Sequence, residues 1–306
     1  MMSVSLDLAR YRAWFQTSAS LQITDYPGSM WRGAFGHALK TAACTQRRPD
    51  CSTCAERYDC PYPQLFESTT AVEPVRPYVF EPQVFSGYFL SGSLLGLDLV
   101  VFGWLNGWLP LLNAALQQLG ERGLGVREPV SLTLVDLQQQ VGSDGADWRS
   151  LWQPGSGDLI AAPSAAITIP PSPRRARLTL ITPLKLKYRG ALVQPDTFTA
   201  KDLLIALARR FEACASIMDT LPLTPEPDIW LAGAETLIER AELSWQDTHH
   251  YSSRQREALK LGGLTGHLVL RGAVLERIWL WLWLGQWLHL GSSTTTGLGR
   301  YVVQAM

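Results

Sequence analysis

His37 is the residue of this sequence that is best placed to transfer a proton. The segment 29–43 has the periodicity of a helix, with Ser29 as its expected N-cap. At ~100° per residue, the larger apolar residues gather on one side of that helix: Trp31, Phe35, Ala38, Leu39 and Ala42. His37 falls on the other side with Gly33 and Lys40, so its imidazole is expected to meet something outside the core. The alternative is an ordinary surface histidine.

Four clustered cysteines follow this segment. Their spacing is C-x₆-C-x₂-C-x₅-C, and they are Cys44, Cys51, Cys54 and Cys60. The first residues, Met1–Arg10, lack the apolar core of a secretory signal, so the cysteines are more typical of reduced metal ligands than of disulfides. Four thiolates predict a closed, structural Zn²⁺ site, although the spacing is not that of a standard zinc ribbon. The fifth cysteine, Cys214, falls in an apolar helical pattern that is typical of a core.

A loop rich in glycine and hydroxyl residues, Leu290–Tyr301, is the third candidate site. It lies between the Trp-rich apolar segment 275–290 and the β-like run 301–303, so it is expected to join a helix to the last strand. Its glycines permit positive φ and close approach of a ligand, and its hydroxyl and backbone N–H groups can bind phosphate. The alternative is a flexible surface loop with turn chemistry only.

A cluster of basic residues opens the second half of the chain. Six of them, with no acidic residue between, lie within sixteen positions: Arg174, Arg175, Arg177, Lys185, Lys187 and Arg189. Because the formal net charge of the chain is 0, any polyanion site must arise from such local clustering. Each single arginine is equally compatible with an ordinary solvated surface.

Length and composition set the frame that holds these candidates. The 306 residues suffice for two domains, and an apolar content of 46% is ample for their cores. The most apolar run, 278–290, is too short and too interrupted to span a bilayer, so we expect a soluble, cytoplasmic protein. The segment 154–173, with Gly, Ser and Pro at both ends, is the best linker candidate. We place the boundary near Ser172, which gives domains 1–172 and 173–306.

The order of elements in the second half is β-α-β-β-α-β, which is typical of a ferredoxin-like, RRM-type domain. We expect a strand at 178–187, a helix at 199–218, strands at 234–245 and 266–271, a tryptophan-bearing helix and a last strand. Leucine neighbours favour the core, rather than a base-stacking platform, for Trp279, Trp283 and Trp287. In the first half we expect strands or hairpins at 6–15 (a strand or a short helix), 85–90, 94–101, 130–141 and 148–152, and a helix at 107–119.

Four motifs, in this order, resemble one family. They are Trp31–Leu39, the run Cys60–Tyr62 with Leu65–Glu67, the segment 251–266 and the loop Gly291–Tyr301. Each is loose alone, but together they resemble the CRISPR repeat-processing endoribonucleases, the Cas6 branch of the RAMP superfamily, from about Tyr26 to the C-terminus with a weaker centre. The resemblance implies an α+β fold of two tandem ferredoxin-like domains, with a cysteine-rich insertion in the first.

The resemblance also implies a metal-independent ribonuclease. In such enzymes the ribose 2′-hydroxyl attacks the scissile phosphate and leaves a 2′,3′-cyclic phosphate and a 5′-hydroxyl. Family members commonly use a histidine of the first helix as general acid or base, which maps onto His37. Lys40 would stabilise charge on the phosphoryl oxygens, and Arg32 is a second candidate for this role. Tyr26 is the nearest upstream candidate for the tyrosine that some relatives pair with the histidine.

The expected partner is CRISPR repeat RNA, with other Cas proteins of an effector complex as further candidates and no membrane. In the family the glycine loop follows the RNA backbone, which maps onto Gly291, Thr294, Thr295, Thr296, Gly297 and Gly299, with Arg300 as an added phosphate contact. The basic cluster, together with Arg254 and Arg256, would hold a hairpin stem. Catalysis is expected to need no cofactor, and zinc would be structural.

Two other functions stay open at this point. A non-catalytic RAMP subunit would bind crRNA with the same fold and loop, but would not need a titratable residue at position 37. A zinc-dependent hydrolase is disfavoured because catalytic zinc keeps an open ligand position, which an all-cysteine site does not offer.

Overall fold

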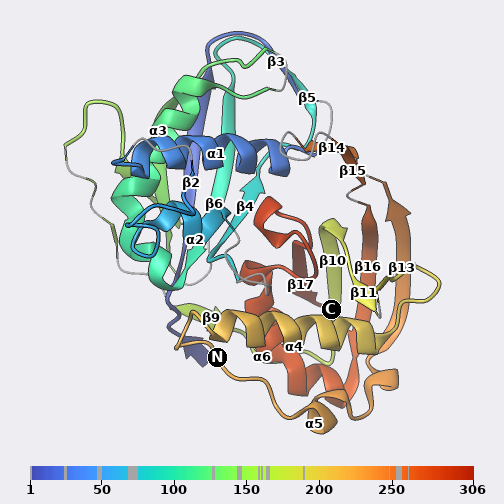
Figure 1. The fold of residues 1–306 in the computed structure, drawn as a ribbon. Helices are drawn as coiled ribbons and strands as arrows, with labels where there is room; N and C mark the ends of the chain where they lie inside the picture. Colours follow the sequence, from blue (N-terminus) through green and yellow to red (C-terminus); the bar gives the residue numbers. More distant parts are fainter. Residues whose placement is uncertain are drawn as a thin grey trace. The chain divides into compact units, whose positions relative to one another are not determined.

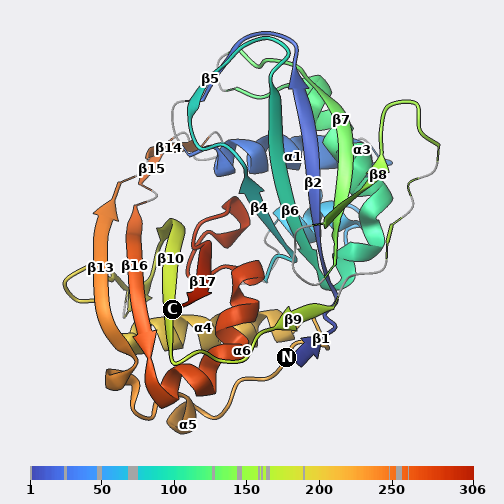
Figure 2. The ribbon, with the colours of Figure 1, turned by 180° about the vertical axis from the view of Figure 1, so that it is seen from behind.

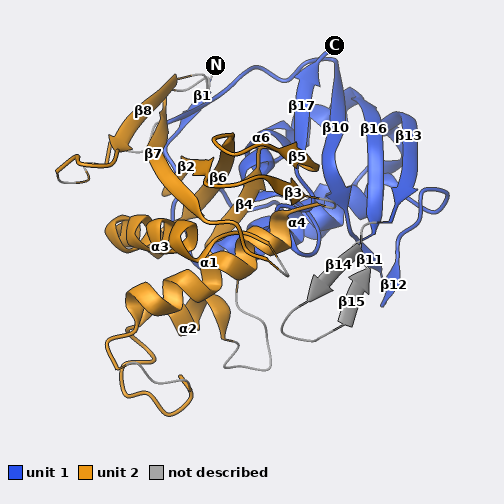
Figure 3. Cartoon of the chain, turned by 90° about the horizontal axis from the view of Figure 1, so that it is seen from above, with its two compact units in different colours: residues 1–6, 166–306 blue, residues 7–165 orange. Residues whose placement is uncertain are grey.

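The computed structural model describes residues 2–23, 26–46, 50–67, 75–125, 128–142, 147–157, 159, 161–162, 166–188, 190–247, 249–252, 257–260 and 262–306, and for 249–252 and 257–260 only the backbone. The chain forms two compact units (Figure 3). In chain order, residues 7–165 (orange) are called the first unit here, and residues 1–6 with 166–306 (blue) the second unit. The division after residue 165 precedes the expected boundary near Ser172. The first residues belong to the second unit because β1 (Met2–Val4) pairs antiparallel with β9 (Ile167–Ile169).

The unit 7–165 is built on one five-stranded antiparallel sheet with the strand order β4-β6-β2-β7-β8. Its main elements are β2 (Leu8–Thr17), α1 (Gly28–Ala43), β4 (Tyr78–Pro82), β6 (Leu94–Phe102), α3 (Leu109–Arg122), β7 (Leu132–Val141) and β8 (Asp147–Trp152). The shorter ones are β3 (Leu21–Ile23), α2 (Pro61–Phe66), β5 (Gly87–Phe89) and η1 (Gly103–Trp108). The helices α1 and α3 cover one face of this sheet, and the other face is seen in Figure 2.

The second unit carries a four-stranded antiparallel sheet in the order β13-β16-β10-β17. Its main elements are β10 (Arg175–Leu184), α4 (Ala200–Ala215), β13 (Ile238–Gln246), β16 (Gly263–Arg271), α6 (Gly272–Leu288) and β17 (Tyr301–Ala305). The shorter ones are β11 (Lys187–Tyr188), β12 (Ala191–Leu192), α5 (Pro227–Leu231), η2 (Ala234–Thr236), β14 (His249–Ser252), β15 (Glu257–Lys260) and η3 (Thr294–Thr296). The helices α4 and α6 contact each other, and α6 packs on β16 and β17 (Figure 1).

Both units follow the β-α-β-β-α-β order, with the first and third strands of the motif at the centre of the sheet. The prediction of two tandem ferredoxin-like domains is therefore confirmed. The four clustered cysteines lie between α1 and α2, in the first of them. None of the helices among the described residues combines the length and the apolar character needed to cross a membrane.

Helix α1 ends at Ala43 as expected, but its start corrects the sequence reading. The N-cap is Pro27, not Ser29, and the Pro27 carbonyl accepts the first helical hydrogen bond from the Trp31 N–H at 2.9 Å. Proline suits this place because its ring restricts φ to a value near that of a helix. The expected apolar stripe is confirmed, since Trp31, Phe35, Ala38 and Leu39 are buried.

Several strands of the second unit differ from their expected bounds, among them β13 and β10. The predicted strand at 234–245 begins only at Ile238, because a 3₁₀ turn follows Gly233, whose φ is +71°. Strand β10 ends at Leu184 rather than 187, after an irregularity in its register with β16 between Leu180 and Leu184.

The tryptophans of α6 anchor the helix to the chain that enters the unit. The indole N–H of Trp279 donates to the Pro170 carbonyl at 2.7 Å, and that of Trp283 donates to the Thr168 carbonyl at 3.1 Å. Trp279 is buried, which confirms its expected place in the core, while Trp283 is half-buried. Each bond gives an indole N–H an acceptor within the protein, which replaces the water that packing of the ring removes.

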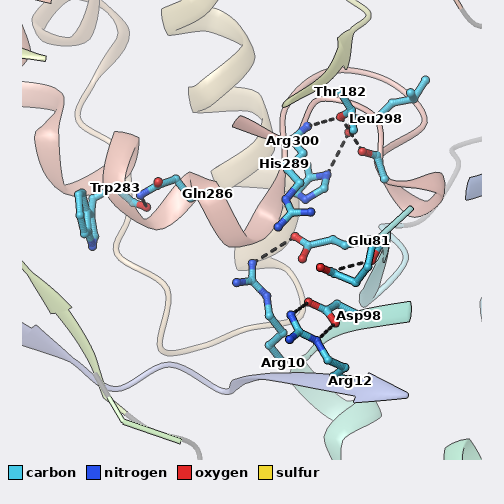
Figure 4. A network of polar contacts seen from close by, with 12 residues as sticks. Arg10, Arg12, Glu81, Asp98, Thr182, Trp283, Gln286, His289, Leu298 and Arg300 are labelled. Carbon is cyan, nitrogen blue, oxygen red and sulfur yellow. Dashed lines mark hydrogen bonds and ion pairs between the residues drawn. The ribbon is translucent and has the colours of Figure 1, made fainter. Parts of the chain in front are cut away.

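Charged pairs are built into the sheet of the first unit, on β2, β4 and β6 (Figure 4). Arg12 donates from Nε to Asp98 Oδ1 at 2.6 Å and from Nη2 to Asp98 Oδ2 at 2.8 Å, a bidentate pair. The Arg12 guanidinium also lies 4.1 Å from the centre of the Trp148 ring. Burial raises the pKa of Asp98, and the bonds from Arg12 oppose that shift.

This geometry predicts a large loss of stability in Arg12→Ala. Removing the guanidinium leaves the buried Asp98 carboxylate without its bidentate partner, which is expected to lower the free energy of unfolding by about 3–5 kcal/mol. Urea denaturation of wild type and variant measures this difference. Arg149→Ala, at an exposed position of β8, is the matched control and should change stability by no more than about 0.5 kcal/mol. Equal effects of the two substitutions would contradict a stabilising role of the pair.

Candidate functional site

His37 lies on the outer side of α1, away from the buried stripe. Its side chain is exposed, whereas Trp31 and Phe35 of the same helix are buried. One turn before it, the position of a Cβ on Gly33 would have nothing within 4 Å, so the surface beside the imidazole is open. An exposed imidazole on a helix that is fixed by its other face can exchange protons with a ligand.

Lys40, one turn after His37, faces the α2 side of the helix. Its ammonium lies 3.9 Å from Glu67 Oε1 and 5.1 Å from the centre of the Tyr62 ring. Both partners follow the cysteine cluster in the chain. The role of Lys40 in charge stabilisation stays a prediction, and it would require the ammonium to turn from Glu67 toward the side of His37.

Arg32 and Tyr26 also have structural partners. Arg32 donates from Nε to the Tyr78 hydroxyl at 3.1 Å and lies over the Phe66 ring. Burial raises the pKa of Tyr78, against the effect of Arg32. Tyr26 stacks on Phe85, with 5.8 Å between the ring centres, ahead of the first turn of α1. With a rise of 1.5 Å per residue, His37 lies roughly 14 Å further along the helix axis, so the structure does not bring Tyr26 to the imidazole.

The four clustered cysteines line one small pocket of about 20 Å³, together with Lys40 and Glu56. Tight turns bring them there, since the Cys54 N–H donates to the Cys51 carbonyl at 3.2 Å and the Cys60 N–H donates to the Glu56 carbonyl at 2.9 Å. All four are free thiols, and burial raises the pKa of Cys51 and Cys60.

The fit of this site to zinc rests on its donor set rather than on its spacing. Four thiols that converge on one pocket supply the ligand type that Zn²⁺ prefers. However, across the described part of the chain no three Cys, His, Asp or Glu side chains stand in an arrangement that could hold a metal. Zinc binding therefore stays a proposal, and it would require the thiols to move closer together.

The glycine loop joins α6 to β17, as expected, and its backbone departs repeatedly from the usual regions. Five residues between α6 and β17 have φ between +60° and +88°: His289, Gly291, Ser293, Gly297 and Gly299. The buried Gly299 allows the closest approach, because a Cβ there would lie 1.8 Å from the Leu290 carbonyl oxygen. The Cβ of any other residue would therefore collide with the backbone of the loop.

Hydrogen bonds fix both ends of this loop to each other and to the end of β10. The Leu290 N–H donates to the Gly299 carbonyl at 3.0 Å, and the Gly299 N–H donates to the Pro183 carbonyl at 3.0 Å. The Thr182 hydroxyl donates to the Gly297 carbonyl at 2.7 Å and accepts from the Arg300 N–H at 2.8 Å (Figure 4). Among the described residues, no backbone carbonyl accepts from the N–H groups of Ser293, Thr294 or Thr295. These N–H groups can serve an anion.

The structure separates the predicted basic cluster into two sets. Arg175 lies at the start of β10 and donates to Glu239 of β13 at 2.7 Å, and the exposed Arg177 is next to it. Lys185 and Lys187 follow the other end of β10, and at the rise of a β-strand Lys185 lies roughly 26 Å from Arg177 along the chain. Arg174, just before β10, is exposed. Arg189, Arg254 and Arg256 lie outside the described residues.

Lys185 and Lys187 instead share a pocket with two cations that the sequence reading did not assign to the site, Arg209 and Arg210 of α4. The loop contributes Gly291 and Ser292 to the same pocket. The signal was present in the sequence, because an adjacent arginine pair occurs in the polar stripe of an amphipathic helix. What the sequence lacked was the packing of that stripe beside the glycine loop.

Two families match the chain in succession. The AF_1859 N-terminal domain family matches residues 6–164, and the family described as CRISPR-associated endoribonuclease Cas6 matches residues 178–301. A curated relative, an uncharacterised protein of Archaeoglobus fulgidus, is 33% identical over 127 residues, which are 40% of this chain and 44% of that protein. The chain thus matches less than half the length of this relative.

Solved structures with the same fold include several Cas6 proteins. A Cas6 product complex has a TM-score of 0.55 at 15% identity, covering 97% of this chain and 100% of the other. Thermus thermophilus Cas6 has a TM-score of 0.54 at 13% identity, covering 98% and 100%. A partial Cas6-RT-Cas1–Cas2 complex has a TM-score of 0.58 at 13% identity, covering 99% of this chain and 47% of the other. At these identities the likeness concerns the fold.

The cysteine pocket predicts a bound metal that depends on its thiols. Protein purified without chelator is expected to contain about one zinc per chain, because four thiolates complete a tetrahedral shell. Elemental mass spectrometry measures the content, and Cys54→Ser should lower it. Cys214→Ala, which removes the buried cysteine of α4, should leave it unchanged. Protein that contains no zinc, or an equal content in Cys54→Ser, would contradict the proposal.

The loop geometry predicts a clash in Gly299→Ala. The added Cβ would collide with the Leu290 carbonyl oxygen, and the alanine backbone would also have to adopt a φ of +72°. The free energy of unfolding should therefore fall by more than the roughly 1–2 kcal/mol that a left-handed backbone alone costs. Gly155→Ala is the matched control, because Gly155 has a φ of +79° with nothing within 4 Å of the added Cβ. Thermal unfolding compares the two variants. Equal losses would show that the close contact at Gly299 has no cost.

Proposed function

This chain belongs to the Cas6 family, with an N-terminal domain of the AF_1859 family, and on that premise we propose that it is a metal-independent endoribonuclease. It binds CRISPR repeat RNA and cleaves the precursor transcript into crRNAs. The 2′-hydroxyl beside the scissile phosphate attacks in line, and the products carry a 2′,3′-cyclic phosphate and a 5′-hydroxyl. The RNA itself thus supplies both the nucleophile, its 2′-oxygen, and the electrophile, its phosphorus. The protein needs to supply proton transfer and positioning.

The observation that carries this proposal is the exposed His37 on the open side of α1. A helix whose opposite face is buried through Trp31 and Phe35 holds the histidine in a fixed direction. The imidazole would take the proton of the 2′-hydroxyl or return one to the 5′-oxygen, for which it needs only hydrogen-bond reach. The open surface beside Gly33 supports access of an RNA backbone to the ring.

The glycine loop is the second part of the proposal. Its backbone is fixed before any ligand arrives, and the N–H groups of Ser293, Thr294 and Thr295 donate to no backbone carbonyl of the described residues. Such groups bind phosphate without the entropic cost of ordering a loop. Because the net charge is 0, we expect a discrete RNA path with a salt dependence set by a few cations.

One observation favours a second function, a non-catalytic subunit that holds crRNA. The two candidates for a second catalytic group have other contacts, since Lys40 pairs with Glu67 and Tyr26 stacks on Phe85. A single titratable group can transfer protons, but a second one usually adds to the rate. The similarity to a chain in a Cas6-RT-Cas1–Cas2 complex supports other Cas proteins as partners under either function.

A cleavage assay with an end-labelled repeat RNA in EDTA tests the proposal. Wild type should cut one phosphodiester bond and leave a 2′,3′-cyclic phosphate, and His37→Ala should lower the rate by roughly 10²- to 10⁴-fold with RNA binding retained. His267→Ala is the matched histidine control, because His267 lies on β16 and pairs with Glu242. Tight binding without cleavage by wild type would instead establish the crRNA-holding subunit.

A further inference from the structure

The second unit contains a cavity of about 300 Å³ that the proposed chemistry at His37 does not use. It lies between the polar face of α4, the hairpin β11–β12 and the start of the glycine loop. The face of α4 that borders it carries Ile205 and Ala206, and one turn later Arg209. The opposite face is buried through Leu203, Leu207 and Phe211, so the wall of the cavity is fixed.

The cavity is strongly cationic for a protein without net charge. Four cations line it, Lys185, Lys187, Arg209 and Arg210, against one carboxylate, Asp202. That carboxylate forms the capping box of α4, where it accepts from both the N–H and the hydroxyl of Thr199, at 2.8 and 2.7 Å. The ligand is therefore expected to be an anion.

The position of one of these cations is fixed by the chain around it. Arg210 donates from Nε to the Leu288 carbonyl, the last residue of α6, at 2.9 Å. This bond holds the guanidinium at the side of the cavity next to the loop. A planar guanidinium held in place is suited to recognise phosphate oxygens.

The walls also suit something larger than an inorganic anion. Leu186 and Val193 supply an apolar surface, and Tyr188 adds an aromatic ring that is 50% exposed. A volume of about 300 Å³ is at the lower limit of pockets that take small organic molecules. An apolar and aromatic surface beside a cationic rim matches a nucleobase attached to a phosphate.

The cavity is continuous with the glycine loop. Gly291 and Ser292 line it, and the Ser292 N–H donates to the Lys185 carbonyl at 2.9 Å. The loop can approach Lys185 this closely because Gly291 has no Cβ. A Cβ at this position would lie 2.5 Å from the Lys185 carbonyl oxygen. A polynucleotide that follows the loop therefore passes the mouth of the cavity.

We propose that this cavity binds a single unpaired ribonucleotide of the RNA that the glycine loop holds. The nucleobase stacks on Tyr188, and the adjoining phosphate meets Lys185, Arg209 and Arg210. The inference rests on the proposed function in that the ligand is the same RNA. The protein would thereby select RNAs with an unpaired residue at one fixed distance from the segment on the loop.

The test combines RNAs that lack one base with variants of Tyr188, in the His37→Ala background so that no RNA is cut. Fluorescence anisotropy measures binding of a repeat RNA made abasic at each position in turn. One position should lose roughly tenfold in affinity when its base is removed, and less than about twofold once Tyr188→Ala is present. Tyr188→Phe should behave as the parent, because stacking needs the ring and not the hydroxyl.

Salt dependence tests the phosphate contact. Arg209→Ala should reduce the slope of log affinity against log salt by about one, whichever base is missing. Lys201→Ala, at an exposed position of the same helix outside the cavity, is the matched control and should leave the slope unchanged.

Three outcomes separate this inference from the proposed function. Tight RNA binding in which no position is coupled to Tyr188 would overturn the nucleotide pocket and leave the function standing. A nucleoside monophosphate that binds in an Arg209-dependent manner without competing with RNA would assign the cavity to a free nucleotide and also overturn the inference. If neither wild type nor the His37→Ala protein binds repeat RNA, the proposed function itself is wrong.

Discussion

The glycine loop depends on one buried hydroxyl, that of Thr182. It donates to the Gly297 carbonyl and accepts from the Arg300 N–H, so a single side chain at the end of β10 ties down the last turn before β17. The buried His289 supports the first turn, with Nδ1 lying 3.2 Å from the Leu298 carbonyl oxygen. A loop held at both ends in this way has little entropy left to lose when it meets a polyanion.

Much of the fold could be predicted because periodicity and element order are local properties of the sequence. The stripe of α1 fixed which side His37 would face, and the order of elements in the second half gave the ferredoxin-like unit. Local pattern was less reliable at element ends, where Pro27 rather than Ser29 caps α1. Such choices are decided by a few hydrogen bonds that have no periodic signature.

The candidate site could be predicted only in part, since side-chain partners come from distant positions. Lys40 meets Glu67 across the cysteine segment, and no spacing rule links the two. A run of basic residues suggested one patch, but an extended strand carries Arg175 and Lys185 far apart. Conversely, Lys185 and Arg209 line the same cavity. This proximity can be predicted only when the packing of α4 is known.

The pairing of β1 with β9 has a consequence for how the chain acquires its structure during synthesis. Met2 is translated before the unit 7–165 and Ile169 after it, although the two residues lie opposite each other in the β1–β9 pair. At about 5–20 residues per second, the first strand waits on the order of ten seconds or more for its partner. The unit 7–165 can complete its own sheet in that interval, so β1 can pair with β9 after that unit has folded.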